Sequence, residues 1–85
     1  MKKTIFLTGA TGTMGYAGMT EILRYPDNYH LRILARPSTK NKELLVPLAS
    51  KVEVIWGDLT NYNDILRGVT GSDIVLHVGG MVSPQ

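Results

Sequence analysis

The feature that most constrains the fold is a regular alternation of two hydrophobic patterns along only 85 residues. Short apolar runs, typical of buried strands, alternate with longer segments in which apolar residues recur at helical spacing. The expected strands cover 4–8, 31–35, 52–56 and 73–78, and the expected helices cover 15–24, 41–49 and 61–69. The chain therefore reads as βαβαβαβ.

This order of elements predicts an α/β fold with a parallel sheet, because strands that alternate with helices are joined by right-handed crossovers. In a doubly wound sheet the four strands take the order 3-2-1-4. A chain of 85 residues is long enough for one small hydrophobic core. Folding buries about 60% of the surface that the unfolded chain exposes. Since no helix is predicted after the fourth strand, we expect the amino-terminal part of a Rossmann-type doubly wound sheet within a longer protein.

Several residues set the predicted helix boundaries. Pro47 interrupts the second helix, because proline lacks the N–H that a helix interior requires. Thr60 is the predicted N-cap of the third helix, and Gly68 or Gly71 ends it. The residues expected to face the sheet in that helix lie at i, i+3, i+4 and i+7: they are Tyr62, Ile65, Leu66 and Val69.

Composition excludes several classes of protein. With 44% apolar and 19% charged residues the chain is typical of a folded domain, and a net charge of +2 is too small for a nucleic-acid-coating protein. No cysteine and only two histidines are present, so we predict no metal site. No apolar run is long enough to span a bilayer or to serve as a signal peptide. We therefore expect a cytoplasmic protein without nucleic-acid or membrane partners.

The segment between the first predicted strand and the first predicted helix is rich in glycine. Gly9 permits a tight turn, Gly12 lets the backbone approach a pyrophosphate, and Gly15 allows close packing of the helix. The helix N-terminus directs free N–H groups and its positive dipole end toward the phosphates. The GxxGxxG spacing alone also fits ordinary turns, but its position favours a dinucleotide cradle. The predicted members are Gly9, Thr11, Gly12, Thr13, Met14 and Gly15.

The end of the second predicted strand bears on which dinucleotide is bound. A carboxylate there binds the ribose hydroxyls of NAD, whereas an arginine forms charge-assisted hydrogen bonds with the 2′-phosphate of NADP. This chain has Arg36 followed by Lys40, and no acid occurs before Glu43. We predict Arg36 and Lys40 at the cofactor site and NADP as the cofactor, with NAD as the alternative. Both side chains also fit a solvated loop.

Three motifs together resemble those of the extended short-chain dehydrogenase/reductase superfamily of NAD(P)-dependent epimerases, dehydratases and reductases. They are Thr8-Gly9-Ala10-Thr11-Gly12-x-x-Gly15, Gly57-Asp58-Leu59 and Gly71-x-Asp73-x-Val75-x-His77-x-Gly79. The resemblance implies that residues 1–85 are the amino-terminal part of a single NAD(P)-binding Rossmann domain. It also implies hydride exchange with a bound nicotinamide, a small-molecule carbonyl or sugar substrate, and a homodimeric full-length protein.

The resemblance implies roles for individual residues as well. Asp58 inherits a contact with the adenine, with Leu59 beside it. Val78, Gly79 and Gly80 line the cofactor channel near the adenosine, although relatives usually carry alanines in place of the two glycines. Asp58 also fits a turn-forming or helix-capping acid.

The superfamily's proton-transfer pair, Tyr-x-x-x-Lys, is absent from the sequence. None of the four tyrosines is followed by lysine four residues later; they are Tyr16, Tyr25, Tyr29 and Tyr62. In the superfamily the lysine and the cofactor charge lower the phenol pKa, so that the tyrosine can act as acid or base near neutrality. We therefore assign no catalytic residue, predict that the 85 residues alone are inactive, and expect the catalytic and substrate-binding parts beyond Gln85. The alternative is a dinucleotide-sensing, non-catalytic regulator of the atypical branch of the superfamily.

Overall fold

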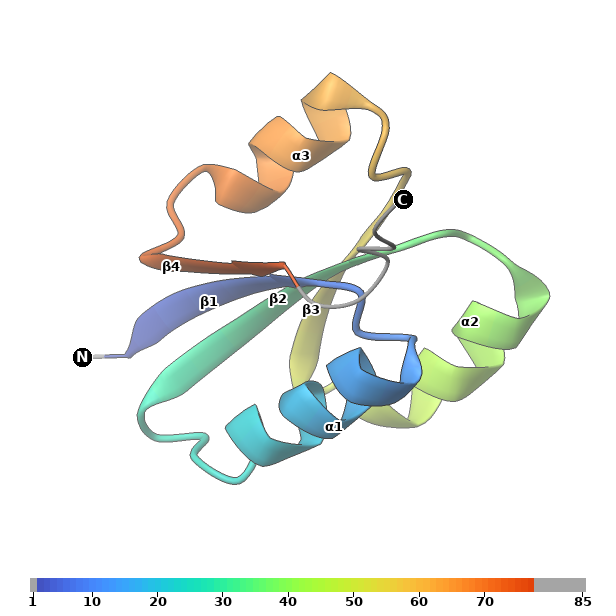
Figure 1. Cartoon of the computed structure of the whole chain (residues 1–85). Coiled ribbons are helices and arrows are strands. Elements are labelled where there is room, and N and C mark those ends of the chain that lie inside the picture. Colours follow the sequence, from blue (N-terminus) through green and yellow to red (C-terminus); the bar gives the residue numbers. More distant parts are fainter. Residues whose placement is uncertain (1, 78–85) are drawn as a thin grey trace, which may run out of the picture.

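The computed structural model describes residues 2–77 and shows the expected alternation of strands and helices (Figure 1). A short 3-10 turn, Val46–Leu48, follows the second helix at the predicted interruption by Pro47. The strands are β1 Lys3–Thr8, β2 Tyr29–Ala35, β3 Val52–Trp56 and β4 Ile74–His77. The helices are α1 Thr13–Ile22, α2 Thr39–Leu45 and α3 Tyr62–Val69.

The four strands form one parallel sheet in the order β3-β2-β1-β4, which confirms the predicted topology. Ile5 of β1 lies opposite Leu31 of β2 on one side and Ile74 of β4 on the other. Leu31 in turn lies opposite Val52 of β3. Because all strands run in the same direction, their carboxyl ends and the loops that follow them meet at one edge of the sheet.

Helices cover both faces of the sheet, with α1 and α2 on one face and α3 on the other (Figure 1). Alternate residues of β1, β2 and β3 therefore belong to two separate cores. The core under α1 and α2 contains Ile5, Leu7, Ala10, Met19, Leu31, Ile33, Ala35, Leu45 and Val52. The smaller core under α3 contains Phe6, Leu34 and Ile55, with Ile65 packed against them.

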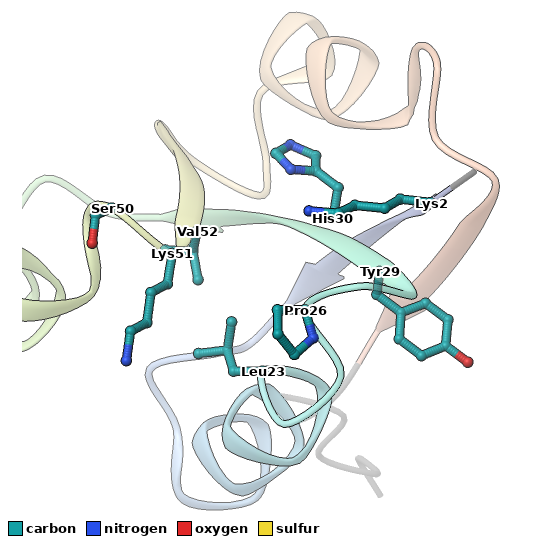
Figure 2. Close-up of a pocket in the computed structure, with 8 residues that line it drawn as sticks. All are labelled: Lys2, Leu23, Pro26, Tyr29, His30, Ser50, Lys51 and Val52. Atoms are coloured by element: carbon teal, nitrogen blue, oxygen red, sulfur yellow. The ribbon is translucent and has the colours of Figure 1, made fainter.

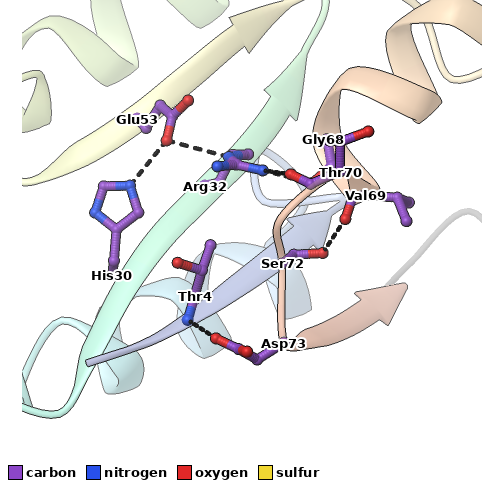
Figure 3. A network of polar contacts seen from close by, with 9 residues as sticks. All are labelled: Thr4, His30, Arg32, Glu53, Gly68, Val69, Thr70, Ser72 and Asp73. Atoms are coloured by element: carbon purple, nitrogen blue, oxygen red, sulfur yellow. Dashed lines mark hydrogen bonds and ion pairs between the residues drawn. The ribbon is translucent and has the colours of Figure 1, made fainter. Parts of the chain in front are cut away.

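Two contacts fix α3 on the sheet. Gly68 lies against the Phe6 ring so closely that a Cβ on the glycine would lie 2.0 Å from Phe6 Cζ. Arg32 of β2 donates hydrogen bonds to the carbonyls of Gly68 at 2.9 Å and Thr70 at 2.7 Å, and its Nε donates to Glu53 Oε1 at 3.1 Å (Figure 3). The arginine thereby satisfies carbonyls at the carboxyl end of the helix, which have no partner within it.

The structure corrects two expectations about α3 and decides a third. Its N-cap is Asn61, whose Oδ1 accepts the Asp64 N–H at 3.2 Å, so the prediction of Thr60 was wrong. Of the two glycines predicted to end the helix, Gly68 lies within it against Phe6, whereas Gly71 directly follows the C-cap Thr70 and has φ of 78°, so the alternative of Gly71 is confirmed. The predicted sheet-facing set is wrong except for Ile65, since the other three members are exposed: they are Tyr62, Leu66 and Val69.

The side chains of the edge strand β4 are exposed. Ile74, Val75 and Leu76 are all exposed, although their partners in β1 are buried. Among residues 2–77, none of the helices has the length and apolar character needed to cross a membrane.

Candidate functional site

The glycine loop forms a tight turn between β1 and α1. Gly9 has φ of 81°, a left-handed conformation that favours glycine. The turn is closed by a hydrogen bond of 3.1 Å from the Gly12 N–H to the Gly9 carbonyl. The Tyr16 N–H then donates to the Gly12 carbonyl at 2.8 Å as the first bond of the helix. The chain thus leaves the strand and enters the helix within a few residues.

Gly12 and Gly15 lack side chains for different reasons. A Cβ on Gly15 would lie 1.7 Å from the Gly9 carbonyl oxygen and 2.4 Å from its carbon, so the fold itself requires glycine there. A Cβ on Gly12 would lie 3.5 Å from the same oxygen, which is an ordinary contact, and its φ of −82° suits any residue. Nothing in the fold requires glycine at position 12, and the missing side chain leaves the N-terminus of α1 open to a ligand.

The first turn of α1 offers backbone donors. Gly12 is the N-cap and provides no side-chain acceptor, and the first turn carries no acidic residue. The N–H groups of Met14 and Gly15 precede the first bond of the helix, and neither has an acceptor among the described residues. These donors and the positive end of the helix dipole favour an anion at this position.

A pocket of about 210 Å³ lies beside the glycine loop, at the carboxyl ends of the first three strands. It brings together four of the predicted site residues: Gly9, Thr11, Arg36 and Leu59. The remaining lining residues were not predicted; they are Thr8, Leu34, Ala35, Asn41 and Gly57. Ligands of open α/β sheets bind outside the carboxyl ends of the strands, which makes this pocket the candidate site.

Asn41 is, with Thr8, one of the two polar pocket residues that sequence reasoning missed. Its Nδ2 donates to the Arg36 carbonyl at 3.0 Å, and its backbone N–H donates to Ser38 Oγ at 3.1 Å. Ser38 is the N-cap of α2, so the cap and the asparagine together fix the loop that carries Arg36. The signal in the sequence was a serine three residues before a polar residue, the spacing of a capping interaction.

Arg36 is exposed at the end of β2 and lines the pocket, and it forms no ion pair with any residue between 2 and 77. Its guanidinium is therefore available to an anionic group in the pocket. Lys40 lies in the first turn of α2, is exposed and is not among the residues that line the pocket. The structure thus brings Arg36 to the site and leaves Lys40 outside the pocket.

Asp58 forms a turn after β3. Its Oδ1 accepts hydrogen bonds from the N–H and the hydroxyl of Thr60, both at 2.8 Å. These two hydrogen bonds, with a smaller contribution from the positive charge of Arg36, hold the pKa of the Asp58 carboxyl below its ordinary value. The carboxylate is therefore ionised near neutrality. Gly57 and Leu59 line the pocket on either side of it.

A larger pocket, of about 400 Å³, lies at the opposite end of the sheet (Figure 2). It is formed at the amino ends of β2 and β3, beside the loop that follows α1. Its lining residues are Lys2, Leu23, Pro26, Tyr29, His30, Ser50, Lys51 and Val52. It contains none of the predicted site residues. Because the helix N-terminus and its donors lie at the other edge, the pocket beside the glycine loop is the candidate site, although its volume is smaller.

The remaining predicted residues are distributed as follows. Met14 is exposed in the first turn of α1. His77, at the end of β4, shares a hydrogen bond with the buried hydroxyl of Thr8 beside the glycine loop. Val78, Gly79 and Gly80 lie outside the described residues. Within residues 2–77 no three His, Asp or Glu side chains gather as a metal site would require.

Known proteins resemble this chain in sequence along nearly its whole length. The model of the NmrA-like family matches residues 1–84. UDP-glucose 4-epimerase of Rickettsia bellii (strain RML369-C) is 31% identical over 83 residues, and the match covers 93% of this chain and 24% of the relative. UDP-glucose 4-epimerase of Rickettsia akari (strain Hartford) is 30% identical over the same length, with the same coverage. The chain thus spans about a quarter of the length of these relatives.

Solved structures show the same architecture. The X-ray structure of Pen from Bacillus thuringiensis superposes with a TM-score of 0.77 at 26% identity, covering 94% of this chain and 25% of that one. AtPrR2 in its apo form superposes with a TM-score of 0.74 at 17% identity and shares the fold. With its parallel sheet, its glycine loop and a family match along nearly its whole length, the chain belongs to the NmrA-like family within the extended short-chain dehydrogenase/reductase superfamily.

Proposed function

We propose that residues 1–85 are the amino-terminal part of a single Rossmann domain that binds a nicotinamide dinucleotide and prefers NADP. The observation that carries this proposal is the meeting of three features at one edge of the sheet. They are the open N-terminus of α1 at Gly12, the pocket at the carboxyl ends of the strands, and the free guanidinium of Arg36 on its rim. Family membership supports the dinucleotide, and Arg36 supports NADP over NAD.

The described residues suit each part of such a ligand. The N–H groups at the start of α1 would receive the pyrophosphate, in the space that a side chain on Gly12 would fill. Arg36 would pair with the 2′-phosphate, and the ionised Asp58, beside Leu59, would accept a hydrogen bond from the exocyclic amine of the adenine. When bound, the nicotinamide supplies hydride transfer, and this segment contributes binding and orientation.

The proposal assigns proton transfer to residues outside this segment. The sequence has no Tyr-x-x-x-Lys pair, and His77 is engaged with Thr8 beside the loop. We accordingly propose that the active protein is longer, as the epimerase relatives are, and that it acts on a sugar or other carbonyl compound as a homodimer. The 85 residues alone are expected to bind the cofactor without turnover.

The test is a titration of the purified protein with NADP and with NAD, followed by calorimetry or by cofactor fluorescence. Tighter binding of NADP supports the proposal, and a folded protein that binds neither dinucleotide refutes it. A dinucleotide-sensing regulator would use the same pocket, so binding alone does not separate the two functions. Hydride exchange between NADPH and a carbonyl substrate, measured on the full-length protein, separates the enzyme from the sensor.

A further inference from the structure

Asp64 of α3 is a carboxylate whose partners lie in the loop that borders the pocket. Its side chain is 17% exposed. Its Oδ2 accepts the backbone N–H of Asp58 at 2.9 Å, and its Oδ1 accepts from Arg67 at 3.2 Å. The carboxylate therefore connects the first turn of a helix to the backbone of the loop after β3.

Gly57 provides the space for this carboxylate. A Cβ on Gly57 would lie 2.4 Å from Asp64 Oδ2 and 2.5 Å from its Cγ. Gly57 is not among the glycines with positive φ in residues 2–77, so glycine is needed here for room and not for backbone conformation. The glycine of the Gly57-Asp58-Leu59 motif is thus explained by a contact within the protein.

Both ends of this connection are held in place. At the helix end, Asn61 caps the Asp64 N–H at 3.2 Å, and a carboxylate in the first turn is favoured by the helix dipole. At the loop end, the Gly57 N–H donates to the Ala35 carbonyl at 2.9 Å and continues the pairing of β3 with β2. Asp64 therefore sets the position of the residues between Gly57 and α3.

From this geometry we infer that Asp64 is a positioning residue for adenine recognition. The inference rests on the proposed function and adds a residue to it that contacts no ligand. Leu59 lines the pocket and Asp58 lies beside it, while Asp58 Oδ1 is used by Thr60, which leaves Oδ2 for the adenine amine. Without the hydrogen bond to Asp64 the backbone of Asp58 is free to move. Asp58 Oδ2 is then no longer held in one direction toward the adenine.

The experiment compares the dissociation constants of NADP and of its hypoxanthine analogue, which has a carbonyl in place of the exocyclic amine. Their ratio is insensitive to the fraction of folded protein, so a loss of stability alone does not change it. We expect the unmutated protein to prefer NADP by about three- to tenfold, the range of an ordinary hydrogen bond, because solvent screens the partly exposed Asp58 carboxylate. Asp64→Ala should bring the ratio close to one, and Asp64→Asn should restore most of it because its amide oxygen can accept the same N–H.

Asp73→Ala is the matched control. The Asp73 carboxylate likewise accepts a backbone N–H, that of Thr4 at 2.8 Å, but at the amino end of β1 (Figure 3). This variant should leave the ratio unchanged. Amide hydrogen exchange at Asp58 supplies a readout that needs no ligand, since Asp64→Ala should speed exchange there and Asp73→Ala should not.

The outcomes separate the two claims. Failure of the unmutated protein to bind either dinucleotide refutes the proposed function, whereas the exchange rate at Asp58 still reports on the contact with Asp64. NADP binding with a ratio that Asp64→Ala leaves unchanged overturns the positioning role and leaves the proposed function standing. A ratio near one in the unmutated protein also overturns it, because there is then no adenine recognition to position.

Discussion

Replacing Gly15 by alanine tests whether the fold, and not the ligand, requires this glycine. The added Cβ would lie 1.7 Å from the Gly9 carbonyl oxygen, where ordinary contacts begin at 3.4 Å, and 3.0 Å from the Ala10 Cα. All of these neighbours are backbone atoms, so no side chain can rotate away to relieve the overlap. Either α1 must move away from β1 or the turn at Gly9 must open.

The expected cost follows from the size of this overlap. Overpacking in a well-packed interior costs about 1–3 kcal/mol, and a backbone overlap belongs at the upper end. A chain of this length has a total stability of about 4–13 kcal/mol, so about 3 kcal/mol is a large share of it. With a urea m-value of about 1 kcal/mol/M, the unfolding midpoint should fall by about 2–3 M.

Gly12→Val is the companion variant, because the backbone at Gly12 is extended and its Cβ position is free of overlap. Its unfolding midpoint should change by less than about 1 M, since Gly and Val differ at an N-cap by no more than about 1 kcal/mol. It should nevertheless abolish dinucleotide binding. Equal midpoints for Gly15→Ala and the unmutated protein in urea unfolding would refute the assignment of Gly15 to the fold, and undiminished affinity in Gly12→Val would remove the loop from the site.

Three further predictions concern other parts of the molecule. Arg36→Asp should reduce the preference for NADP over NAD by about ten- to a hundredfold, the range of a charge-assisted contact, and equal affinities in the unmutated protein would make Arg36 a loop residue. Gly68→Ala should destabilise the fold by about 1–3 kcal/mol in urea unfolding, because its Cβ would overlap the Phe6 ring. Hydrogen bonding from His30, with help from Arg32, lowers the pKa of Glu53 below its ordinary 4.5, so the stability from this pair is present above that pH and is lost as the pH falls through the lowered pKa. Glu53→Gln should reduce the loss of unfolding free energy at acid pH by a few tenths of a kcal/mol, a small effect because the carboxylate is half exposed. The same loss of unfolding free energy in both proteins would contradict the pairing.

The order of elements and of strands was predictable because it depends on patterns that a single sequence displays. Strand-like and helix-like runs alternate along the chain, and this alternation favours a parallel sheet whose strands are joined by right-handed helical crossovers. The position of the glycine loop was predictable for the same reason, since Gly9 to Gly15 lie between a strand and a helix. Arg36, on which the proposed preference for NADP rests, lies at a strand end that the pattern also locates, and the preference itself stays a prediction.

The packing of α3 was not predictable from its hydrophobic spacing. The stripe from Tyr62 to Val69 has helical periodicity, yet Tyr62 is 76% exposed and the close contact with the sheet is made by Gly68. Periodicity marks a face that is apolar, and it does not report how closely the helix approaches or which residue lies at the point of contact. That depends on a residue in another element, the Phe6 ring of β1.

Contacts between polar groups five and six residues apart were missed for a related reason. Asn41 reaches the Arg36 carbonyl, and Asp64 reaches the Asp58 N–H, only because the loops after β2 and β3 take defined shapes. Sequence reasoning left Asp58 with two roles, a turn former and an adenine contact. The structure shows the turn, in which Thr60 occupies one of the two carboxylate oxygens, and the adenine contact stays a prediction.

The central claim is that a nicotinamide dinucleotide binds at the carboxyl edge of the sheet. The most direct measurement is a map of backbone amide chemical shifts during titration of the isotopically labelled protein with NADP. The account predicts that the largest changes fall on Gly12 to Gly15, on Arg36 and on Leu59, with little change at the amino edge. Changes centred instead on the larger pocket around Leu23 and Lys51, or no changes at all in the folded protein, would contradict it.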